Sequence, residues 1–168
     1  TTALIAQHAQ HAGALPGLIQ QVLLEAGAGP AELTAVLLGD GPGSFTGLRV
    51  GVVTALTLGQ TLGLRTHGVC TLDTLAAEAA DQVGTEFIAA IDARRKEVYW
   101  ARYDDSGKPL TGPQVDRPAE VAELALPLDP SAAVLAAKVA AGQIATYPLE
   151  PLYLRRPDAT AQVGIKYA

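Results

Sequence analysis

Apolar positions near the start of the chain recur with the period of an α-helix. Gln20, Gln21 and Glu25 are the only polar residues on the outer side, and the apolar Leu24 lies off the main face. Because this outer side is so poorly charged, we expect the helix to be covered on a second side. The main apolar face of the helix consists of the residues at positions i, i+3, i+4, i+7, i+8 and i+11, which are Leu15, Leu18, Ile19, Val22, Leu23 and Ala26.

Short apolar runs then alternate with helical stretches. Strands that alternate with helices predict an α/β layer with a largely parallel sheet. Threonine is a residue type that caps helices, and Thr71 stands at the start of the last of these helical stretches. The predicted order is strand 35–39, glycine-rich loop 40–47, helix 48–62, strand 66–70 and helix 71–81.

The pattern changes near Gly84, where hairpin signals replace the strand–helix alternation. We therefore divide the chain into two subdomains, residues 1–84 and residues 85–168. The elements predicted in the second are strands 87–91 and 98–103 joined by a charged hairpin at 92–97, a turn at 104–107, a short helix from Arg117, a helix at 132–141 capped by Ser131, and an extended tail from Tyr147.

Composition limits what the chain can do. Its 168 residues are 49% hydrophobic, enough to build a core, and the formal net charge is −5. Proteins that bind nucleic acid on their own usually carry a basic stripe, whereas the densest basic cluster here, Arg94 to Lys96, is followed at once by Glu97. Protein or small-molecule partners are therefore favoured. The single cysteine, Cys70, has apolar neighbours that indicate a core residue rather than a nucleophile.

The glycine-rich segment from Gly39 to Arg49 is the most informative part of the chain. It lies between a buried strand and a helix, where backbone N–H groups and the helix dipole can hold an anion. Its spacing matches neither a P-loop nor the dinucleotide-binding fingerprint, so on spacing alone a structural turn is favoured. The residues that could bind an anion are Gly41, Gly43, Ser44, Thr46, Gly47 and Arg49.

The following helix carries a strip of small residues. Gly47, Gly51, Ala55, Gly59 and Gly63 recur every four residues and let another backbone approach closely. Glycine inside a helix costs roughly 1 kcal/mol relative to alanine, so the strip needs a packing reason. It packs on the protein's own sheet, on a helix of another subunit, or on both through different faces. A second, mixed face consists of Val50, Val53, Thr54, Thr57, Leu58 and Thr61.

We identify no catalytic constellation in the sequence. His8 and His11 are three residues apart but lack a third metal ligand. Neither a Ser-His-Asp context nor a G-x-S-x-G motif is present. Asp92 lies close to Arg94 and Glu97, where a solvated ion pair is favoured over a catalytic carboxylate. The sequence therefore predicts no catalytic residue and no metal site.

The run GPGSFTGLRVG, from Gly41 to Gly51, is a highly specific motif. With the weaker matches it covers most of the chain, and together these pieces resemble the TsaB family, also called YeaZ. The weaker matches, in order, are His11 with Leu15-Pro16 before the first helix, then Gly68–Leu75, Ala90–Arg94, Glu97–Trp100 and Pro151–Pro157.

This resemblance implies an actin/Hsp70/sugar-kinase-like (ASKHA, ribonuclease H-like) α/β fold with two α/β subdomains. It implies a bacterial, cytoplasmic protein that helps to make threonylcarbamoyladenosine, the modified adenosine beside the anticodon of tRNA. In that family TsaB is the non-catalytic paralogue of TsaD, the transferase that holds metal and nucleotide. The TsaB–TsaD pair recruits TsaE, an ATPase, and TsaB alone forms a homodimer through the same helices.

The resemblance has consequences for ligands and partners. It implies that this subunit holds no cofactor and that ATP, ADP and metal are bound by the TsaD and TsaE partners. It also implies that tRNA is contacted only through the complex and that the protein has no membrane association. Two alternatives stay open, namely an ASKHA-type ATP-dependent enzyme and a glycoprotease-like (M22) metallopeptidase. The expected dimer or partner interface lies on the first two helices and comprises Leu18, Ile19, Val22, Leu23, Gly47, Val50, Gly51, Thr54, Ala55, Leu58 and Gly59.

The chain also departs from the family pattern. The first hairpin of the family, with its Asp-Thr-Ser turn, is not present, and the segment from Leu126 to Ser131 is abrupt. The sequence also contains no methionine. We therefore expect these residues to be part of a longer chain.

Overall fold

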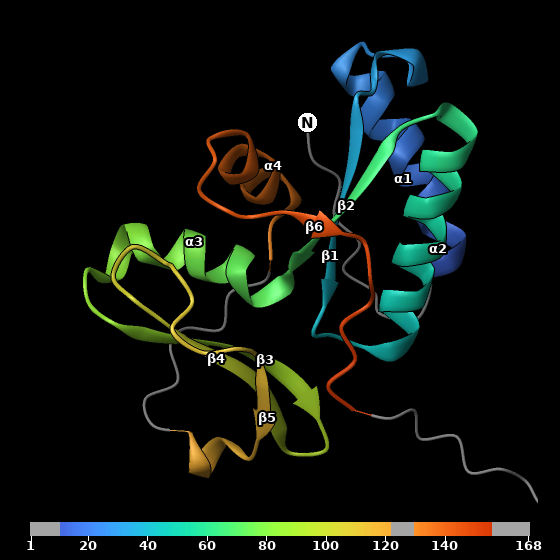
Figure 1. Ribbon diagram of the computed structural model, residues 1–168. Helices are drawn as coiled ribbons and strands as arrows, with labels where there is room; N and C mark the ends of the chain where they lie inside the picture. Colours follow the sequence, from blue (N-terminus) through green and yellow to red (C-terminus); the bar gives the residue numbers. More distant parts are fainter. Residues whose placement is uncertain (1–10, 122–129, 156–168) are drawn as a thin grey trace, which may run out of the picture.

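The structure is a computed structural model that describes residues 11–121 and 130–155 (Figure 1). Within these residues, six strands form two three-stranded sheets. Four α-helices and two short 3-10 helices, Pro30–Glu32 and Pro118–Glu120, connect the strands or cover the sheets. The mixed α/β architecture predicted from the sequence is confirmed.

The first sheet is built on a β-α-β unit. β1 (Ala35–Gly41) and β2 (Arg65–Cys70) are parallel neighbours, and α2 (Phe45–Leu62) connects them. α1 (His11–Ala26) lies beside α2 (Figure 1). The third strand, β6 (Tyr147–Pro148), comes from the far end of the described chain and pairs antiparallel with β2. The parallel pair confirms what the strand–helix alternation predicts.

The second sheet is an antiparallel meander. It contains β3 (Phe87–Arg94), β4 (Glu97–Tyr103) and β5 (Gln114–Asp116), in that order. α3 (Thr71–Val83) crosses one face of this sheet (Figure 1). The chain therefore passes from the first sheet to the second directly through α3.

Most of the core lies between α3 and the second sheet. The rings of Phe87 and Tyr103 stack there with their centroids 5.8 Å apart. A smaller cluster attaches α4 (Ala132–Ala140) to α3, with Leu135 and Ala77 among its members. The main cluster comprises Cys70, Leu72, Leu75, Ala76, Ala79, Phe87, Ala89, Ala101 and Tyr103.

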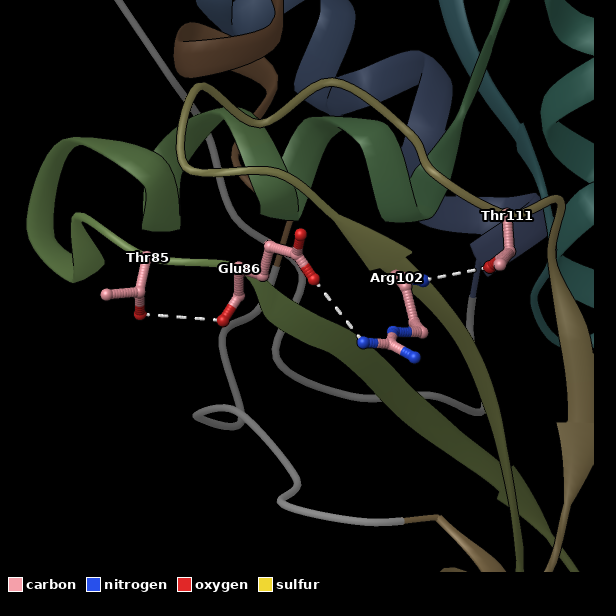
Figure 2. Close-up of polar contacts among 4 residues, drawn as sticks. All are labelled: Thr85, Glu86, Arg102 and Thr111. Atoms are coloured by element: carbon pink, nitrogen blue, oxygen red, sulfur yellow. Dashed lines mark hydrogen bonds and ion pairs between the residues drawn. The ribbon is translucent and has the colours of Figure 1, made fainter.

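The polar contacts at the end of the second sheet where β3 begins and β4 ends are exposed. Figure 2 shows Arg102 of β4, whose guanidinium lies 3.4 Å from the Glu86 carboxylate and whose backbone N–H donates to the Thr111 hydroxyl at 3.0 Å. Both charged side chains are more than half exposed, and such surface ion pairs contribute little to stability. Apolar packing against α3 therefore holds this sheet in place.

The segment after residue 130 returns to the first half of the chain. β6 pairs with His67 and Gly68 of β2, and Lys138 of α4 forms an ion pair with Asp81 of α3 at 2.9 Å. The boundary at Gly84, where α3 ends with a left-handed φ of 66°, stays a prediction.

Several predicted element ends are wrong by a few residues. Strand β1 continues to Gly41 and α2 begins at Phe45, because Ser44 caps that helix by accepting a hydrogen bond from the Gly47 N–H. The glycine-rich loop is thus shorter than predicted. Similarly, β3 and β4 extend into the charged hairpin, so that only two residues form its turn.

Two local predictions about helix starts are also wrong. Thr71 is the first residue of α3 rather than its cap, because the β1–β2 pairing continues to Cys70 and the helix starts immediately afterwards. Pro16, predicted to precede the first helix, lies inside α1. By contrast, the Ser131 hydroxyl accepts from the Val134 N–H, which confirms the predicted cap of α4.

Candidate functional site

The last residues of β1 are packed against the C-terminal part of the described chain. Gly41 has a φ of 128°, and a Cβ at this position would lie 2.6 Å from the carbonyl oxygen of Leu152. The Leu152 N–H donates to the Asp40 carbonyl at 2.8 Å. Only glycine allows this close approach, so Gly41 is required by packing between two distant segments.

The side chains proposed to hold an anion already have contacts within the chain. The Ser44 hydroxyl caps α2, as described above. The Arg49 guanidinium lies 4.2 Å from the centre of the Phe45 ring, which in turn contacts the Tyr153 ring at 5.1 Å. Thr46 is exposed. The structure brings these residues together around the start of α2, and anion binding by the loop stays a prediction.

The strip of small residues on α2 faces the protein's own sheet. A Cβ on Gly51 would lie 3.1 Å from Leu38 of β1, and one on Gly59 would lie 2.5 Å from Thr66 of β2. Ala55, between them, is only 3% exposed. The middle of the strip therefore packs on the protein's own sheet, as one of the interpretations of the sequence predicted. Its ends are at the helix termini, where a Cβ on Gly47 would meet Ser44 and Gly63 takes a left-handed φ of 67°.

The outer surface of α1 and α2 is apolar and exposed. Leu24 of α1 is 82% exposed, and Val53 and Leu56 of α2 are 63% and 47% exposed. None of the described side chains of α1, residues 13–26, is buried. Sequence reasoning set Leu24 outside the main face and did not include Leu56, although their positions away from the buried side of each helix are a usable signal. The predicted residues Leu18, Ile19, Val22, Leu23, Val50, Thr54 and Leu58 are all half-buried.

A cavity of about 740 Å³ lies between the two sheets. Its walls come from the start of α3, the loop 109–113 after β4, and the segment 147–152. Asp73 and Glu150 line it, whereas no lysine, arginine or histidine does so among the described residues. An acidic lining disfavours polyphosphate ligands.

Two tyrosine–aspartate pairs stabilise this region. The Tyr103 hydroxyl donates to Asp73 at 2.7 Å, and the Tyr147 hydroxyl donates to Asp40 at 2.8 Å. Burial raises the pKa of both carboxyl groups, and the tyrosine hydrogen bonds partly offset that rise. Burial likewise raises the pKa of both tyrosines. The first pair joins α3 to β4 and the second joins β6 to β1 within the first sheet, and no local sequence pattern indicates either hydrogen bond.

The chemistry available in the described residues is limited. Burial raises the pKa of the Cys70 thiol to about 12, so the thiolate needed for nucleophilic attack is scarce. No group of three or more His, Cys, Asp or Glu side chains among the described residues could hold a metal ion. In the same part of the chain, no helix is both long enough and apolar enough to cross a membrane.

Comparison with known proteins identifies the family. The family model described as "TsaD: tRNA N6-adenosine threonylcarbamoyltransferase" matches residues 5–165. The solved structure of YeaZ from Pseudomonas aeruginosa superposes with a TM-score of 0.73 and 27% identity, over 90% of this chain and 87% of that one. The chain belongs to the TsaB/YeaZ family. This result agrees with an ASKHA-like α/β fold, and it matches the resemblance carried by the Gly41–Gly51 motif.

Sequence relatives in the TsaB/YeaZ family cover different shares of their own length. Uncharacterized protein Rv3421c of Mycobacterium tuberculosis is 41% identical over 167 residues, covering 89% of this chain and 77% of that protein. The tRNA threonylcarbamoyladenosine biosynthesis protein TsaB of Escherichia coli is 41% identical over 101 residues, covering 58% of this chain and 44% of that protein. Uncharacterized protein ML0378 of Mycobacterium leprae is 42% identical, with 40% of its length covered. The chain thus spans less than half of two of these relatives.

Proposed function

We propose that this protein acts in tRNA threonylcarbamoyladenosine biosynthesis as a non-catalytic scaffold subunit. In this proposal the outer surface of α1 and α2 binds a TsaD-like transferase, and it binds a second copy of the chain when TsaD is absent. The resulting pair recruits a TsaE-like ATPase. ATP, ADP and metal are bound by those partners in the cytoplasm, and this subunit holds no cofactor.

The observation that carries the proposal is the uncovered apolar surface of α1 and α2. α1 packs beside α2 and leaves Leu24 four-fifths exposed, while Val53 and Leu56 project from α2. Burying apolar area stabilises a protein by roughly 25 cal/mol per Å². An exposed apolar surface of this kind indicates a protein interface.

The cavity lined by Asp73 and Glu150 supports the non-catalytic part of the proposal. Cys70 is buried with a raised pKa, and the Asp73 carboxyl accepts a hydrogen bond from the Tyr103 hydroxyl. This arrangement offers no nucleophile with a base beside it. The acidic lining also argues against the ATP-dependent alternative.

The direct test places charges on the exposed surface. Val53 and Leu56 are neighbours on one side of α2, so we expect a Val53→Glu, Leu56→Glu double variant to weaken association with TsaD by about tenfold or more. The thermal midpoint should hardly change, because both side chains are already exposed. Analytical ultracentrifugation and titration with purified TsaD measure both self-association and hetero-association.

A matched control uses an apolar residue with similar exposure elsewhere. Leu110, on the loop after β4, is 49% exposed, and Leu110→Glu should leave association unchanged. Normal assembly of the α2 double variant would contradict the interface assignment. Steady ATP turnover by the isolated protein would contradict the non-catalytic assignment and favour the ATP-dependent enzyme.

A further inference from the structure

The turn between β3 and β4 has an unusual backbone. Arg94, Arg95 and Lys96 are consecutive and have φ values of 63°, 57° and 62°. The strand register also shifts between Asp92 and Arg94, which marks a bulge at the base of the turn. A Cβ makes this left-handed conformation unfavourable, so three such residues in succession store strain in the backbone.

The residue types at this turn do not match its geometry. A two-residue hairpin turn with positive φ at both central positions normally uses Asn-Gly or another glycine-containing pair. Here the central positions hold Arg95 and Lys96, both with long charged side chains and both exposed. Natural proteins break local rules of this kind mostly at functional sites. The mismatch therefore points to a use for the two cations.

A distant arginine holds the base of the turn in place. Arg155 Nη1 donates to the Ala93 carbonyl, which lies in the bulge, at 3.0 Å. The same guanidinium forms an ion pair with Glu97 and lies 5.8 Å from the centre of the Tyr99 ring. The side chain of Arg155 is only 25% exposed. Arg155 therefore holds the backbone at the base of the turn, while Arg95 and Lys96 are exposed at its tip.

The charge at this tip has the opposite sign to that of the chain. The tip and its support hold four basic residues, Arg94, Arg95, Lys96 and Arg155, and two acidic ones, Asp92 and Glu97. The whole chain carries a net charge of −5. In Figure 1 the tip lies at the lower end of the second sheet, away from α1. It can therefore contact an anionic partner while α1 is bound to another protein.

We propose that the β3–β4 tip contacts the phosphate backbone of tRNA in the assembled complex. The proposal rests on the proposed function, which makes tRNA the substrate of the complex, and adds a direct contact from this subunit. Arginine and lysine bind phosphate oxygens through charge-assisted hydrogen bonds. Such contacts position RNA without reading its sequence. The small number of cations agrees with binding that needs TsaD as well.

The test removes the charges and keeps the turn. An Arg95→Asn, Lys96→Gly double variant has the pair that this turn geometry prefers, so it should fold at least as well as the parent protein. In complex with TsaD, its affinity for tRNA should fall roughly tenfold at low salt. The slope of log K against log salt concentration should become shallower by about two.

The matched control removes two cations from elsewhere on the same sheet and its following turn. Arg102 lies at the other end of β4 (Figure 2), and Lys108 follows the next turn. An Arg102→Gln, Lys108→Gln double variant should keep both the parent affinity and the parent salt slope. Arg95→Gln, Lys96→Gln serves as a second variant that removes the charges without introducing glycine.

The outcomes separate this proposal from the proposed function. Unchanged tRNA affinity and salt slope in both tip variants would overturn the RNA contact. If tRNA binding is unchanged but TsaE recruitment is lost, the tip serves an acidic protein partner and the RNA proposal is again overturned. Failure of the parent protein to assemble with TsaD would instead contradict the scaffold function itself.

Discussion

Helices α1 and α3 carry apolar residues with the same helical period but lie in different surroundings. α3 is enclosed by the second sheet on one side and contacts α4 as well, and Leu72 and Ala76 are fully buried. α1 packs beside α2, and Leu24 on its outer side is 82% exposed. Periodicity therefore predicts the main apolar face of a helix, which is half-buried in α1, but it does not say whether an apolar residue outside that face, such as Leu24, is covered within the same chain.

The difference has an energetic meaning. Fully burying a leucine side chain contributes about 1.5–3 kcal/mol relative to leaving it exposed. Leu72 of α3 makes that contribution within the chain, while Leu24 of α1 does not. In the proposed scaffold, a partner subunit supplies the missing cover.

The largest expected effect is on the free energy of unfolding, and it is tested by replacing one leucine of α3 and one leucine of α1. Leu72→Ala should lower the free energy of unfolding by about 2–5 kcal/mol, because it leaves a cavity in the main core. Leu24→Ala should change it by less than about 0.5 kcal/mol. Urea denaturation of the two variants measures both values. Similar losses would show that α1 is as well covered as α3.

The next effect concerns the side of α2 that faces the sheet. Gly59→Val should destabilise the fold by about 1–3 kcal/mol, since a Cβ there would lie 2.5 Å from Thr66 and 3.1 Å from the Leu64 carbonyl. Gln60→Val, at the neighbouring exposed position, is the matched control and should cost only about 0.5 kcal/mol. Thermal denaturation checks the pair. Equal and small losses would show that the strip does not pack on the sheet.

A smaller effect tests the hydrogen bond between α3 and β4. Tyr103→Phe removes the hydroxyl that donates to Asp73 and should cost about 1–2 kcal/mol. Tyr153→Phe changes a tyrosine that is 40% exposed and should cost less than about 0.5 kcal/mol. Denaturant midpoints measure the difference. No loss from Tyr103→Phe would mean that water replaces the lost donor.

The smallest expected effect is a change in the stability of the fold with pH that is caused by the titration of Asp40. Its pKa in the folded protein is raised above the ordinary value of 3.8, mainly by burial, so the folded state binds a proton more tightly than the unfolded state. The contribution of Asp40 to stability is therefore greatest at low pH and declines as pH rises from about 3.8 through the folded-state pKa. Asp40→Asn should remove this decline.

The pH experiment compares thermal midpoints of the parent protein and Asp40→Asn between about pH 4 and pH 8. The variant should gain stability relative to the parent as pH rises. Asp104→Asn is a useful contrast, because hydrogen bonds from Ser106 and Lys108 lower the pKa of that carboxyl. A relative loss of stability in Asp40→Asn at the higher pH values would contradict the assigned shift.

Much of the secondary structure follows from local signals in the sequence. Ser44 and Ser131 cap α2 and α4 through their hydroxyls. Gly27 and Gly84 follow α1 and α3 with positive φ, as glycine after a helix commonly does. The Asp104 side chain also accepts the N–H groups of the turn predicted there. These interactions join residues at most four positions apart, so the amino-acid types alone indicate them.

The features of the candidate site and of the β3–β4 tip were harder to predict from the sequence. The glycine strip on α2 indicated close packing, but only the positions of Leu38 and Thr66 show that the chain's own sheet supplies it. The strained tip at Arg95 was also hidden, because arginine and lysine do not signal a left-handed turn. Both features depend on the backbone geometry of the assembled sheets.

By itself, the sequence predicted the α/β elements, the caps of α2 and α4 and the parallel pair, because each rests on residue types at short spacing, and the family followed from the resemblance carried by the Gly41–Gly51 motif. The tertiary structure alone decided that β6 returns to β2, that Tyr147 reaches Asp40 from 107 residues away, and that the outer surface of α1 and α2 is left uncovered. Contacts over such distances depend on the total free energy of packing, to which many segments contribute at once. No local pattern specifies that sum, which is why the exposure of Leu24 and Leu56 and the strained basic tip became visible only with the fold.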